Sequence, residues 1–260
     1  MTSRSWLDRY NLLVLDEIDS TNLEARRIAE SGVDNNFVIW AKKQTQGKGR
    51  QGKSWQSLSN NLYLSILLNA DSFYNKQSEL CFVAGLAAQK VIEEKLCEAG
   101  RKFDIALKWP NDVMVDGAKI SGILLEAIKI KNKHSLIIGI GINIHNHPKD
   151  LDRSTTSLND LGRQHSDAPE IEAQKILDLT MQYFEYYYAL WQNEGFSKIR
   201  ELWLEKAYNP GGILTASYGA QKISGLFQDI DMQGSLRIKL PSGEIHTLVA
   251  GEIIIDKKEI

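Results

Sequence analysis

The segment QTQGKGRQGKSW, residues 44–55, is the stretch that decides the fold of this 260-residue chain. It fits the phosphate-binding pattern G-x-x-x-x-G-K-[ST] and, through Gly47, Gly49 and Gly52, the dinucleotide-binding pattern G-x-G-x-x-G. Each pattern works by opening a helix whose free amides hold a phosphate group. The residues that follow, WQSLSNNLYLSILL, instead have the apolar run of a strand. The sequence therefore favours a different fold, in which this segment is a loop between strands.

The same loop still has the chemistry of an anion site. Its glycines allow a ligand to approach the backbone closely, and Lys48, Arg50 and Lys53 add positive charge within a few residues. A phosphate group is the ligand that this combination suits best. A mobile basic surface loop has the same composition, so the loop alone does not decide between the two interpretations.

The segments around the loop alternate between strand and helix. One helix is predicted to begin at Thr21, whose spacing to Glu24 is that of a capping box, and to end at Gly32. Another carries Cys81 and Cys97, roughly 24 Å apart along its axis, which excludes a disulfide between them. Both thiols are expected to be buried. Strands are predicted over LLVLDE, NFVIWAKK, NLYLSILLN, IALKWPNDVMV, KISGILLEAIKI and HSLIIGIGINI.

The last third of the chain changes character. A long helix is predicted from Pro169 to about Ala207, and its aromatic side chains are expected to pack in the core. The segment NPGG, residues 209–212, then breaks the chain, and only short strands separated by tight turns follow. This pattern predicts an α/β (α+β) main domain over residues 1–207, with a mixed sheet flanked by helices. A small all-β domain is predicted over residues 208–260.

Composition limits the classes of protein to consider. The chain has 31 Lys and Arg against 33 Asp and Glu, a net charge of −2, without the basic excess of a dedicated nucleic-acid-binding protein. Its two cysteines are too few for a disulfide framework. The sequence shows neither a signal-peptide pattern nor an apolar run of membrane-spanning length. We therefore expect a cytoplasmic protein that does not bind membranes.

Two further segments could carry chemistry. In KWPND, residues 108–112, a lysine at the end of a strand could place its ammonium on a developing negative charge, although a strand-to-turn junction with a lysine on an exposed edge fits the same residues. In GIGIN, residues 139–143, glycines within an apolar strand indicate close approach by a ligand or a packed element. His145 and His147 could share a strand face as metal ligands. Because no third ligand stands at a telling spacing, a polar loop after the strand is favoured.

In order and rough spacing, these segments resemble the biotin–protein ligases. The similar segments are STN at residues 20–22, GKGRQGKSW, KWPNDV, KISGILLE, GIGIN and, near the end, GEIII. The resemblance covers nearly the whole chain from about Leu13 onward, and KWPNDV together with the glycine-arginine loop is highly specific. It implies a catalytic domain like those of class II synthetases and biotin ligases, followed by a small SH3-like β-barrel.

The resemblance also implies an activity, that of a biotin–[biotin carboxyl-carrier protein] ligase. In that family the biotin carboxylate attacks the α-phosphate of ATP, giving biotinyl-5′-AMP and pyrophosphate. A lysine amine of the carrier protein then attacks the activated acyl carbon and releases AMP. Such a reaction needs no covalent enzyme intermediate. ATP and biotin are the substrates, and Mg²⁺ is expected to accompany the phosphates, with its protein ligands unassigned.

Carried over by position, the resemblance implies a set of site residues. Those expected at the biotin have hydroxyl, amide, cationic or backbone groups that face it: Ser20, Thr21, Asn22, Gln44, Lys48, Gly49, Arg50 and Lys108. Those expected at the ATP or adenylate are Arg50, Trp55, Lys108 and Asn143. Arg50, as the main phosphate ligand, and Lys108, between the biotin carboxylate and the α-phosphate, are expected to be the catalytic pair.

This chain departs from the family pattern in two places. Lys48 and Gln51 stand where the family usually has arginine, and lysine keeps the charge at position 48 but loses the bidentate fork. The STN segment begins at residue 20, which leaves no room for the N-terminal helix-turn-helix domain of some members. We therefore expect a monofunctional ligase, a monomer or homodimer, that acts on a biotin carboxyl carrier protein and not on DNA. A lipoate–protein ligase and a non-enzymatic DNA-binding regulator are the alternatives.

Overall fold

The computed structural model describes residues 5–97, 102–151, 153–162, 171–219 and 221–254. Its helices are α1 (Thr21–Glu30), α2 (Glu79–Cys97), α3 (Leu158–Gly162) and α4 (Ala173–Glu205), with short 3₁₀ turns η1 (Ser5–Asp8), η2 (Arg50–Gly52) and η3 (Tyr74–Lys76). Its strands are β1 (Asn11–Ile18), β2 (Phe37–Gln44), β3 (Leu62–Asn69), β4 (Ile105–Lys108), β5 (Asp112–Val115), β6 (Ala118–Ile130), β7 (Lys133–Ile142), β8 (Ile213–Tyr218), β9 (Gln221–Ile230), β10 (Leu236–Lys239), β11 (Ile245–Leu248) and β12 (Glu252–Ile254).

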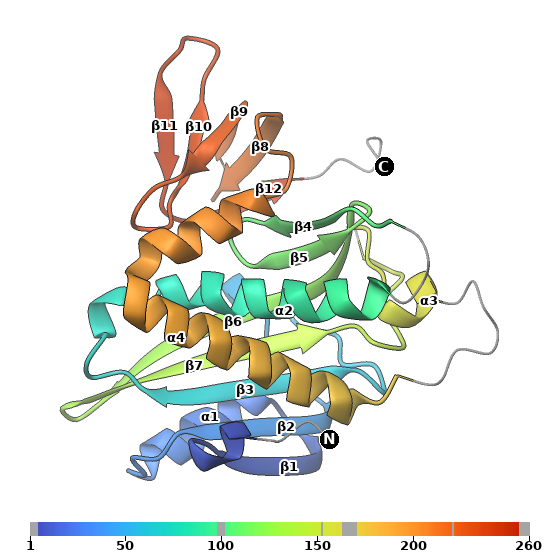
Figure 1. Cartoon of the computed structure of the whole chain (residues 1–260), viewed down its shortest axis with the longest axis vertical. Coiled ribbons are helices and arrows are strands. Elements are labelled where there is room, and N and C mark those ends of the chain that lie inside the picture. Colours follow the sequence, from blue (N-terminus) through green and yellow to red (C-terminus); the bar gives the residue numbers. More distant parts are fainter. Residues whose placement is uncertain (1–4, 98–101, 152, 163–170, 220, 255–260) are drawn as a thin grey trace.

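Seven strands form one large mixed sheet in the order β1-β2-β3-β7-β6-β5-β4. β1 and β2 are parallel, and the remaining neighbours are antiparallel. The other five strands form a separate antiparallel sheet in the order β11-β10-β9-β8-β12 (Figure 1). The predicted mixed α/β fold is therefore confirmed, and the C-terminal sheet is consistent with an SH3-like domain.

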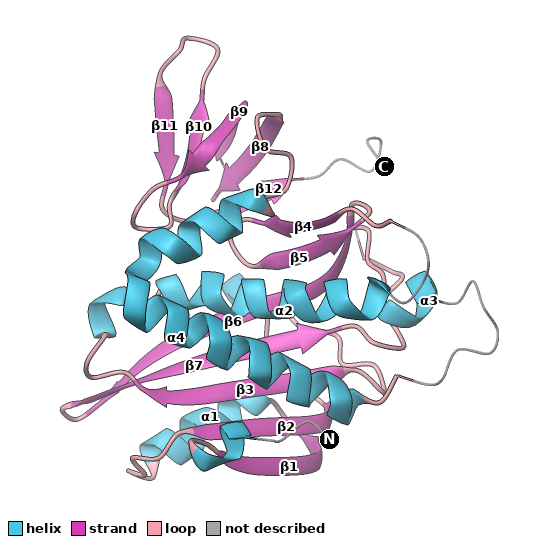
Figure 2. Ribbon diagram, viewed as in Figure 1, coloured by secondary structure: helices cyan, strands magenta, loops and turns pink. Residues whose placement is uncertain are grey.

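Helices cover the two faces of the large sheet unequally. α2 and α4 pack on each other and cover one face, while the short α1 lies on the opposite face near β2 and β3 (Figure 2). The alternation of β3 explains this division, because Leu64, Ile66 and Leu68 belong to the core under α2 and α4, whereas Leu67 packs with α1. Beyond α1, that second face of the sheet is left to be covered by loops.

The long helix is packed as expected. Phe184 and Trp191 of α4 are buried, and Tyr188 stacks against both rings. Tyr186, in contrast, is 62% exposed. The helix bends at Gly195, whose φ of +74° is outside the helical range. The predicted helix start at Pro169 lies outside the described residues. The predicted domain boundary at 207/208 falls in the connection between α4 and β8 and stays a prediction.

Two local predictions are wrong. The capping box of Thr21 and Glu24 does not form: Ser20 is the N-cap residue, and it makes no side-chain capping bond. Gly32 does end the helix, with a φ of +85°. Of the two cysteines on α2, Cys81 is partly buried, but Cys97 is exposed because it occupies the last position of the helix.

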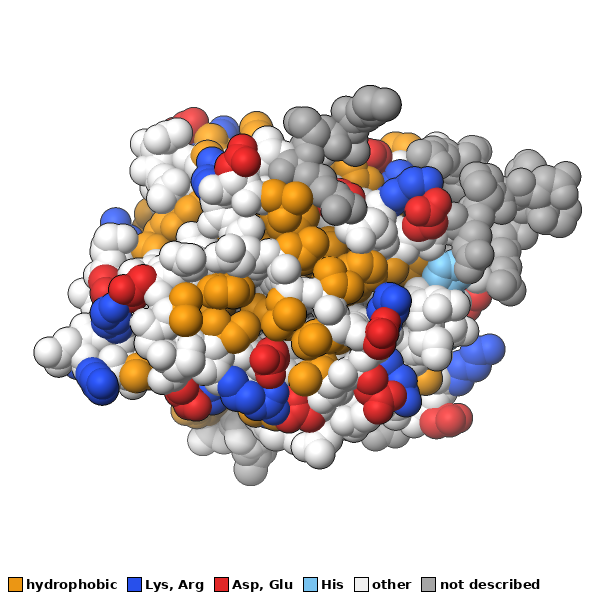
Figure 3. Space-filling model, turned by 90° about the horizontal axis from the view of Figure 1, so that it is seen from below, with side chains coloured by type: hydrophobic (Ala, Val, Ile, Leu, Met, Phe, Trp, Pro, Cys, Tyr) orange, Lys and Arg blue, Asp and Glu red, His pale blue; other side chains and the backbone are white. Residues whose placement is uncertain are grey.

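The edge of the sheet at β1 is open. Among the described residues, β1 pairs only with β2. It carries four consecutive apolar residues at 12–15, of which Val14 is 45% exposed. Seen from below, on the side where β1 and α1 lie in Figure 1, apolar side chains gather across the middle of the surface (Figure 3). In the described part of the chain, no helix is long and apolar enough to cross a membrane.

Candidate active site

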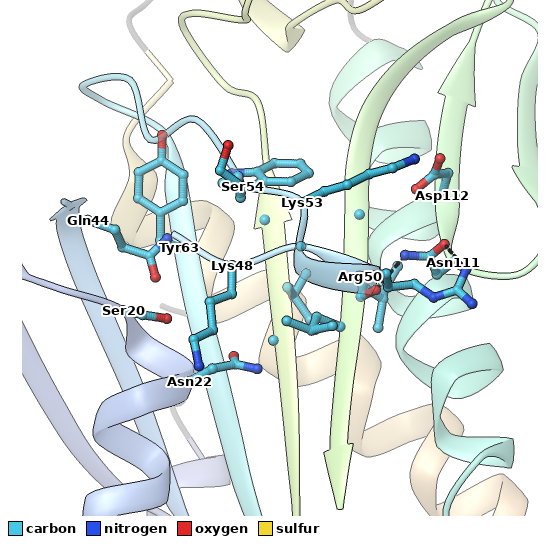
Figure 4. Close-up of a pocket in the computed structure, with 18 of the residues that line it drawn as sticks. Ser20, Asn22, Gln44, Lys48, Arg50, Lys53, Ser54, Tyr63, Asn111 and Asp112 are labelled. Atoms are coloured by element: carbon cyan, nitrogen blue, oxygen red, sulfur yellow. Dashed lines mark hydrogen bonds between the residues drawn. The ribbon is translucent and has the colours of Figure 1, made fainter. Parts of the chain in front are cut away.

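The face of the large sheet that α1 leaves uncovered holds a cavity. The loop between β2 and β3, residues 45–61, folds over this face beside α1 (Figure 4). The cavity between loop and sheet has a volume of about 70 Å³ and is partly open to solvent. The lining comes from the start of α1, the end of β2, the loop, strands β3, β5, β6 and β7, and, at the rim, Arg153 and Glu252.

Glycines make the floor of this cavity flat. Gly122 of β6 and Gly141 of β7 are register partners, and the ring of Trp55 lies on both. A Cβ atom would come within 2.9 Å of the Trp55 ring at Gly122 and within 2.7 Å at Gly141. Gly141 of the GIGIN segment is therefore required by a packed aromatic ring, which is one of the two alternatives that the sequence left open.

One end of the cavity is built from neutral polar groups. The Gln44 Oε1 atom accepts hydrogen bonds from the Thr21 backbone amide at 2.8 Å and from the Thr21 hydroxyl at 3.1 Å. Gln44 Nε2 donates in turn to the Ser57 hydroxyl at 3.0 Å. Gln44 therefore caps α1 from a neighbouring strand. Ser20 and Thr21 are buried and line the cavity.

A second network of hydrogen-bonded polar side chains lies behind this end. The Asn22 amide nitrogen donates to Glu126 at 2.8 Å, and the Ser65 hydroxyl lies 2.6 Å from Asn22 Oδ1. Gly139 passes directly under Asn22, because a Cβ there would lie 2.3 Å from Oδ1. The amide of Asn22 is thus held in one orientation. Together the two hydrogen-bond networks present hydroxyl and amide groups that suit a compact ligand with its own donors and acceptors.

The glycine-rich loop forms a small hairpin and does not open a helix. The Gly49 amide donates to the Lys53 carbonyl at 2.7 Å, and Lys48 and Ser54 form a β-bridge. Gly47 allows no side chain, since a Cβ would lie 2.5 Å from the Trp55 carbonyl oxygen. The next regular strand is β3, as the sequence predicts. The Lys48 side chain points back toward Ser20 and Asn22 (Figure 4).

Arg50 and Lys53 join the loop to the C-terminal domain. Nη1 of Arg50 lies 3.3 Å from Asn111 Oδ1 and 3.2 Å from the Gly251 carbonyl oxygen. Lys53 forms an ion pair with Glu252 at 2.5 Å. Since Gly251 and Glu252 belong to the GEIII segment, the loop and the small domain meet at the rim of the cavity.

The other end of the cavity is cationic. Lys119 of β6 lines it, and the Lys119 ammonium is 5.2 Å from the centre of the Trp55 ring. Its partner is Asp112, a buried carboxylate that also lies 3.4 Å from the Lys108 ammonium. Burial would raise the pKa of Asp112, but the two ammonium groups outweigh it and lower the pKa. Burial lowers the pKa of Lys119, against the attraction of Asp112.

A smaller hollow of about 40 Å³ continues from this cationic end. Trp55, Lys119 and Arg153 line both spaces. Asn143 lines only the smaller hollow, and its amide nitrogen donates to the Thr156 carbonyl at 3.0 Å. The two spaces together form an elongated site with neutral polar groups at one end, cationic groups in the middle and the Trp55 ring beside them.

Comparison with known proteins identifies this arrangement. Residues 14–143 match the model of the biotin/lipoate A/B protein ligase family, and residues 214–256 match that of the biotin protein ligase C terminal domain. The chain is 30% identical to the biotin--[acetyl-CoA-carboxylase] ligase of Paracoccus denitrificans over 231 residues, which are 88% of this chain and 95% of that protein. The chain belongs to the biotin/lipoate A/B protein ligase family.

Other members of the family show the same relationship. The bifunctional ligase/repressor BirA of Bacillus subtilis is 31% identical over 90% of this chain and 70% of its own length. The structure of the Aquifex aeolicus biotin protein ligase in complex with biotin and ATP superposes with a TM-score of 0.77. That ligase is 29% identical to this chain, and the match covers 94% of this chain and 97% of the other.

Most of the residues that the sequence predicts for a ligase site come together. The cavity is lined by Ser20, Thr21, Asn22, Gln44, Lys48, Gly49, Arg50 and Trp55, and Asn143 lies in the adjoining hollow. Lys108 lies outside both spaces: its ammonium donates to the Ile253 carbonyl at 3.1 Å, below the small domain. The lysine that lines the cavity is Lys119.

Sequence reasoning missed several lining residues. Lys119 opens the KISGILLE segment, Asp112 closes KWPND, and Glu252 belongs to GEIII, so each stood in a quoted motif without a role. Arg153 stands in no motif, and nothing in the sequence indicates it. Among the described residues, no cluster of three His, Cys, Asp or Glu side chains could hold a metal ion. His145 and His147 have protein partners instead.

Proposed function

We propose that this chain attaches biotin to a lysine of a biotin carboxyl carrier protein through biotinyl-5′-AMP. A biotin carboxylate oxygen attacks the α-phosphorus of ATP, and the bond to the β-phosphate bridging oxygen breaks to release pyrophosphate. The lysine amine then attacks the acyl carbon, AMP leaves, and the amine loses a proton. The observation that carries this proposal is one cavity in a chain of this family, with neutral amide and hydroxyl groups at one end and Lys119 at the other.

We assign the neutral end to the ureido ring of biotin. Ser20, Thr21 and Gln44 offer the donors and acceptors that a cyclic urea requires, and Asn22 is held beside them. Lys48, whose side chain points toward this end, and Gly49 would close over the bound ring (Figure 4). This part of the proposal rests on position and on hydrogen-bonding chemistry.

We assign the reacting atoms to the cationic end. Arg50 at the cavity rim suits a phosphate, because a guanidinium can hold two phosphate oxygens. Lys119 can stabilise the charge that builds between the biotin carboxylate and the α-phosphate. We propose that Lys119 has the role that the family resemblance implied for Lys108, and that Lys108 supports it through the shared Asp112.

The nucleotide belongs in the adjoining hollow. Trp55 offers an aromatic face there, and Asn143 fixes the backbone that closes it. Magnesium is expected with the ATP phosphates, which supply most of its ligands in such sites. Asp112 and Glu252 are the carboxylates of the lining, and both are paired with lysines. We therefore assign magnesium no protein ligand and no step.

The proposed partner is the acceptor protein, in the cytoplasm, and not DNA. The net charge of −2 supports this choice, since a DNA-binding protein presents a basic surface. A gel-shift assay with DNA from biotin genes tests it: a specific complex would contradict the proposal. Size-exclusion chromatography with and without biotin distinguishes monomer from homodimer.

The central experiment is incubation with ATP and biotin, followed by detection of biotinyl-5′-AMP. Incubation with ATP and lipoate, in parallel, tests whether the chain activates lipoate, the other acid in the family name. We expect biotinyl-AMP without lipoyl-AMP, and a biotinyl adduct when a carrier domain is added. A lipoyl adduct alone would contradict the choice of biotin, and the absence of both adenylates would contradict the proposed chemistry.

A further inference from the structure

His147 lies in the segment that closes the nucleotide hollow. This segment connects β7 to α3 and contributes Pro148, Leu151, Arg153 and Thr155 to the lining. His147 is not part of that lining, and only 14% of its side chain is exposed. Its ring is therefore turned away from the ligand space and into the protein.

The ring of His147 connects the two ends of this segment. Nε2 lies 2.8 Å from Asp160 Oδ2, on α3. Nδ1 lies 2.9 Å from the Thr155 hydroxyl and 3.3 Å from the Pro148 carbonyl. Because Thr155 also donates its proton to Pro148, its oxygen is left to accept from the imidazole. The His147 side chain thus contacts Pro148 near the start of this segment, Thr155 near its end, and Asp160 on helix α3.

The end of this segment, residues 154–156, lies directly beside Lys119. The Lys119 amide donates to the Ser154 carbonyl at 3.0 Å, and the Thr156 amide donates to the Lys119 carbonyl at 2.9 Å. Lys119 and Thr155 are partners in a parallel β-bridge. His147 is thus one hydrogen bond from the residue that flanks the backbone of Lys119.

We infer that His147 is a positioning residue, which fixes this segment against Lys119 and thereby sets the affinity for the nucleotide. The inference rests on the proposed function, since it takes the hollow to be the ATP end of the site. The biotin end is lined from α1 and β2, whose hydrogen bonds do not involve this segment. Losing the imidazole should therefore weaken nucleotide binding and leave biotin binding unchanged.

The test is calorimetric titration with biotin alone, and with α,β-methylene-ATP in the presence of biotin, so that no adenylate forms. We expect His147→Ala to raise the dissociation constant of the nucleotide analogue by up to about tenfold, as for the loss of one hydrogen bond. The dissociation constant of biotin should stay at the parent value. His246→Ala, on β11 of the small domain, is the matched control and should change neither constant.

Two conservative variants separate the two contacts of the ring. The amide of Asn reaches about as far as Nδ1 and can keep the bond to Thr155, whereas the amide of Gln reaches about as far as Nε2 and can keep the bond to Asp160. We expect His147→Asn to retain most of the nucleotide affinity, because Thr155 is the residue beside Lys119. Parent affinity in His147→Ala, or equal losses for biotin and nucleotide, would overturn the inference. Failure of the unaltered chain to make biotinyl-AMP would instead contradict the proposed function.

Discussion

Asp112 and Lys119 form a buried ion pair at the cationic end of the cavity, and each is less than a tenth exposed. The carboxylate comes from the start of β5 and the ammonium from the start of β6. Such a pair is costly to break on one side, because the remaining charge stays buried without a partner. It also sets how much charge Lys119 keeps, since burial alone lowers the pKa of this ammonium.

Asp112→Asn should move the alkaline limit of the reaction to lower pH. Without the carboxylate, the pKa of Lys119 falls further below its ordinary value, so the ammonium loses its proton earlier as the pH rises. The rate of biotinyl-AMP formation, measured across the neutral and alkaline range, should therefore decline at lower pH than in the parent. Asp116→Asn, in the turn after β5, is the control and should keep the parent profile. An unshifted profile in Asp112→Asn would contradict this coupling.

The same substitution should cost about 3–5 kcal/mol of stability, the usual effect of breaking a buried pair. The double variant Asp112→Asn, Lys119→Met removes both charges, so it should recover part of the loss. Thermal unfolding of the parent and both variants measures this. A double variant less stable than Asp112→Asn would show that Lys119 gains little from its partner.

Lys119→Met should lower the rate of biotinyl-AMP formation by about 10²- to 10³-fold, as removal of a group that stabilises transition-state charge does. Lys108→Met should lower it less and reduce the melting temperature, because Lys108 bonds the Ile253 carbonyl of β12. Rates and melting temperatures of the two variants decide between the lysines. If Lys108→Met lost as much rate as Lys119→Met and kept the parent melting temperature, Lys108 would be the catalytic cation instead.

These two lysines show where the sequence ceases to be informative. Periodicity and turn signals located β1 to β7 and the helices α1, α2 and α4, because burial and turn chemistry act locally. Which lysine faces the cavity depends instead on register, and the pairing of β5 with β6 shifts between Val113 and Met114. A shift of this kind changes the face on which later side chains lie. No local pattern marks it.

The start of α1 is a similar case. The spacing of Thr21 and Glu24 predicts a local cap, but Gln44 of β2 binds the Thr21 amide and hydroxyl instead. The free backbone N–H groups at the start of a helix can bind any well-placed oxygen. The Gln44 side-chain oxygen becomes available there only after the sheet has formed. Arg153 likewise enters the site from a connecting segment that carries no motif.

Gly139→Ala should weaken biotin binding by about tenfold or more, as displacement of a buried hydrogen-bonded group does. The added methyl group would lie 2.3 Å from Asn22 Oδ1, so the amide must move away from Ser65. Gly162→Ala is the matched control, because a Cβ there meets nothing within 4 Å. Biotin titration of both variants tests this. Parent affinity in Gly139→Ala would show that the Asn22 amide is dispensable for the ring.

Arg50→Ala should weaken biotin binding and release biotinyl-AMP faster, by roughly ten- to a hundredfold, as expected when a charged hydrogen bond is lost. Arg50 reaches both Asn111 and the Gly251 carbonyl, so it holds the loop to the small domain in addition to its proposed phosphate contact. Arg50→Lys keeps the charge and loses the planar fork, and an intermediate release rate is expected. The measurement is the half-life of the adenylate complex after gel filtration. Lys53→Ala removes an exposed ion pair with Glu252 from the same loop and should change this half-life far less. If Arg50→Ala retained the adenylate as long as the parent, the phosphate role of Arg50 would be refuted.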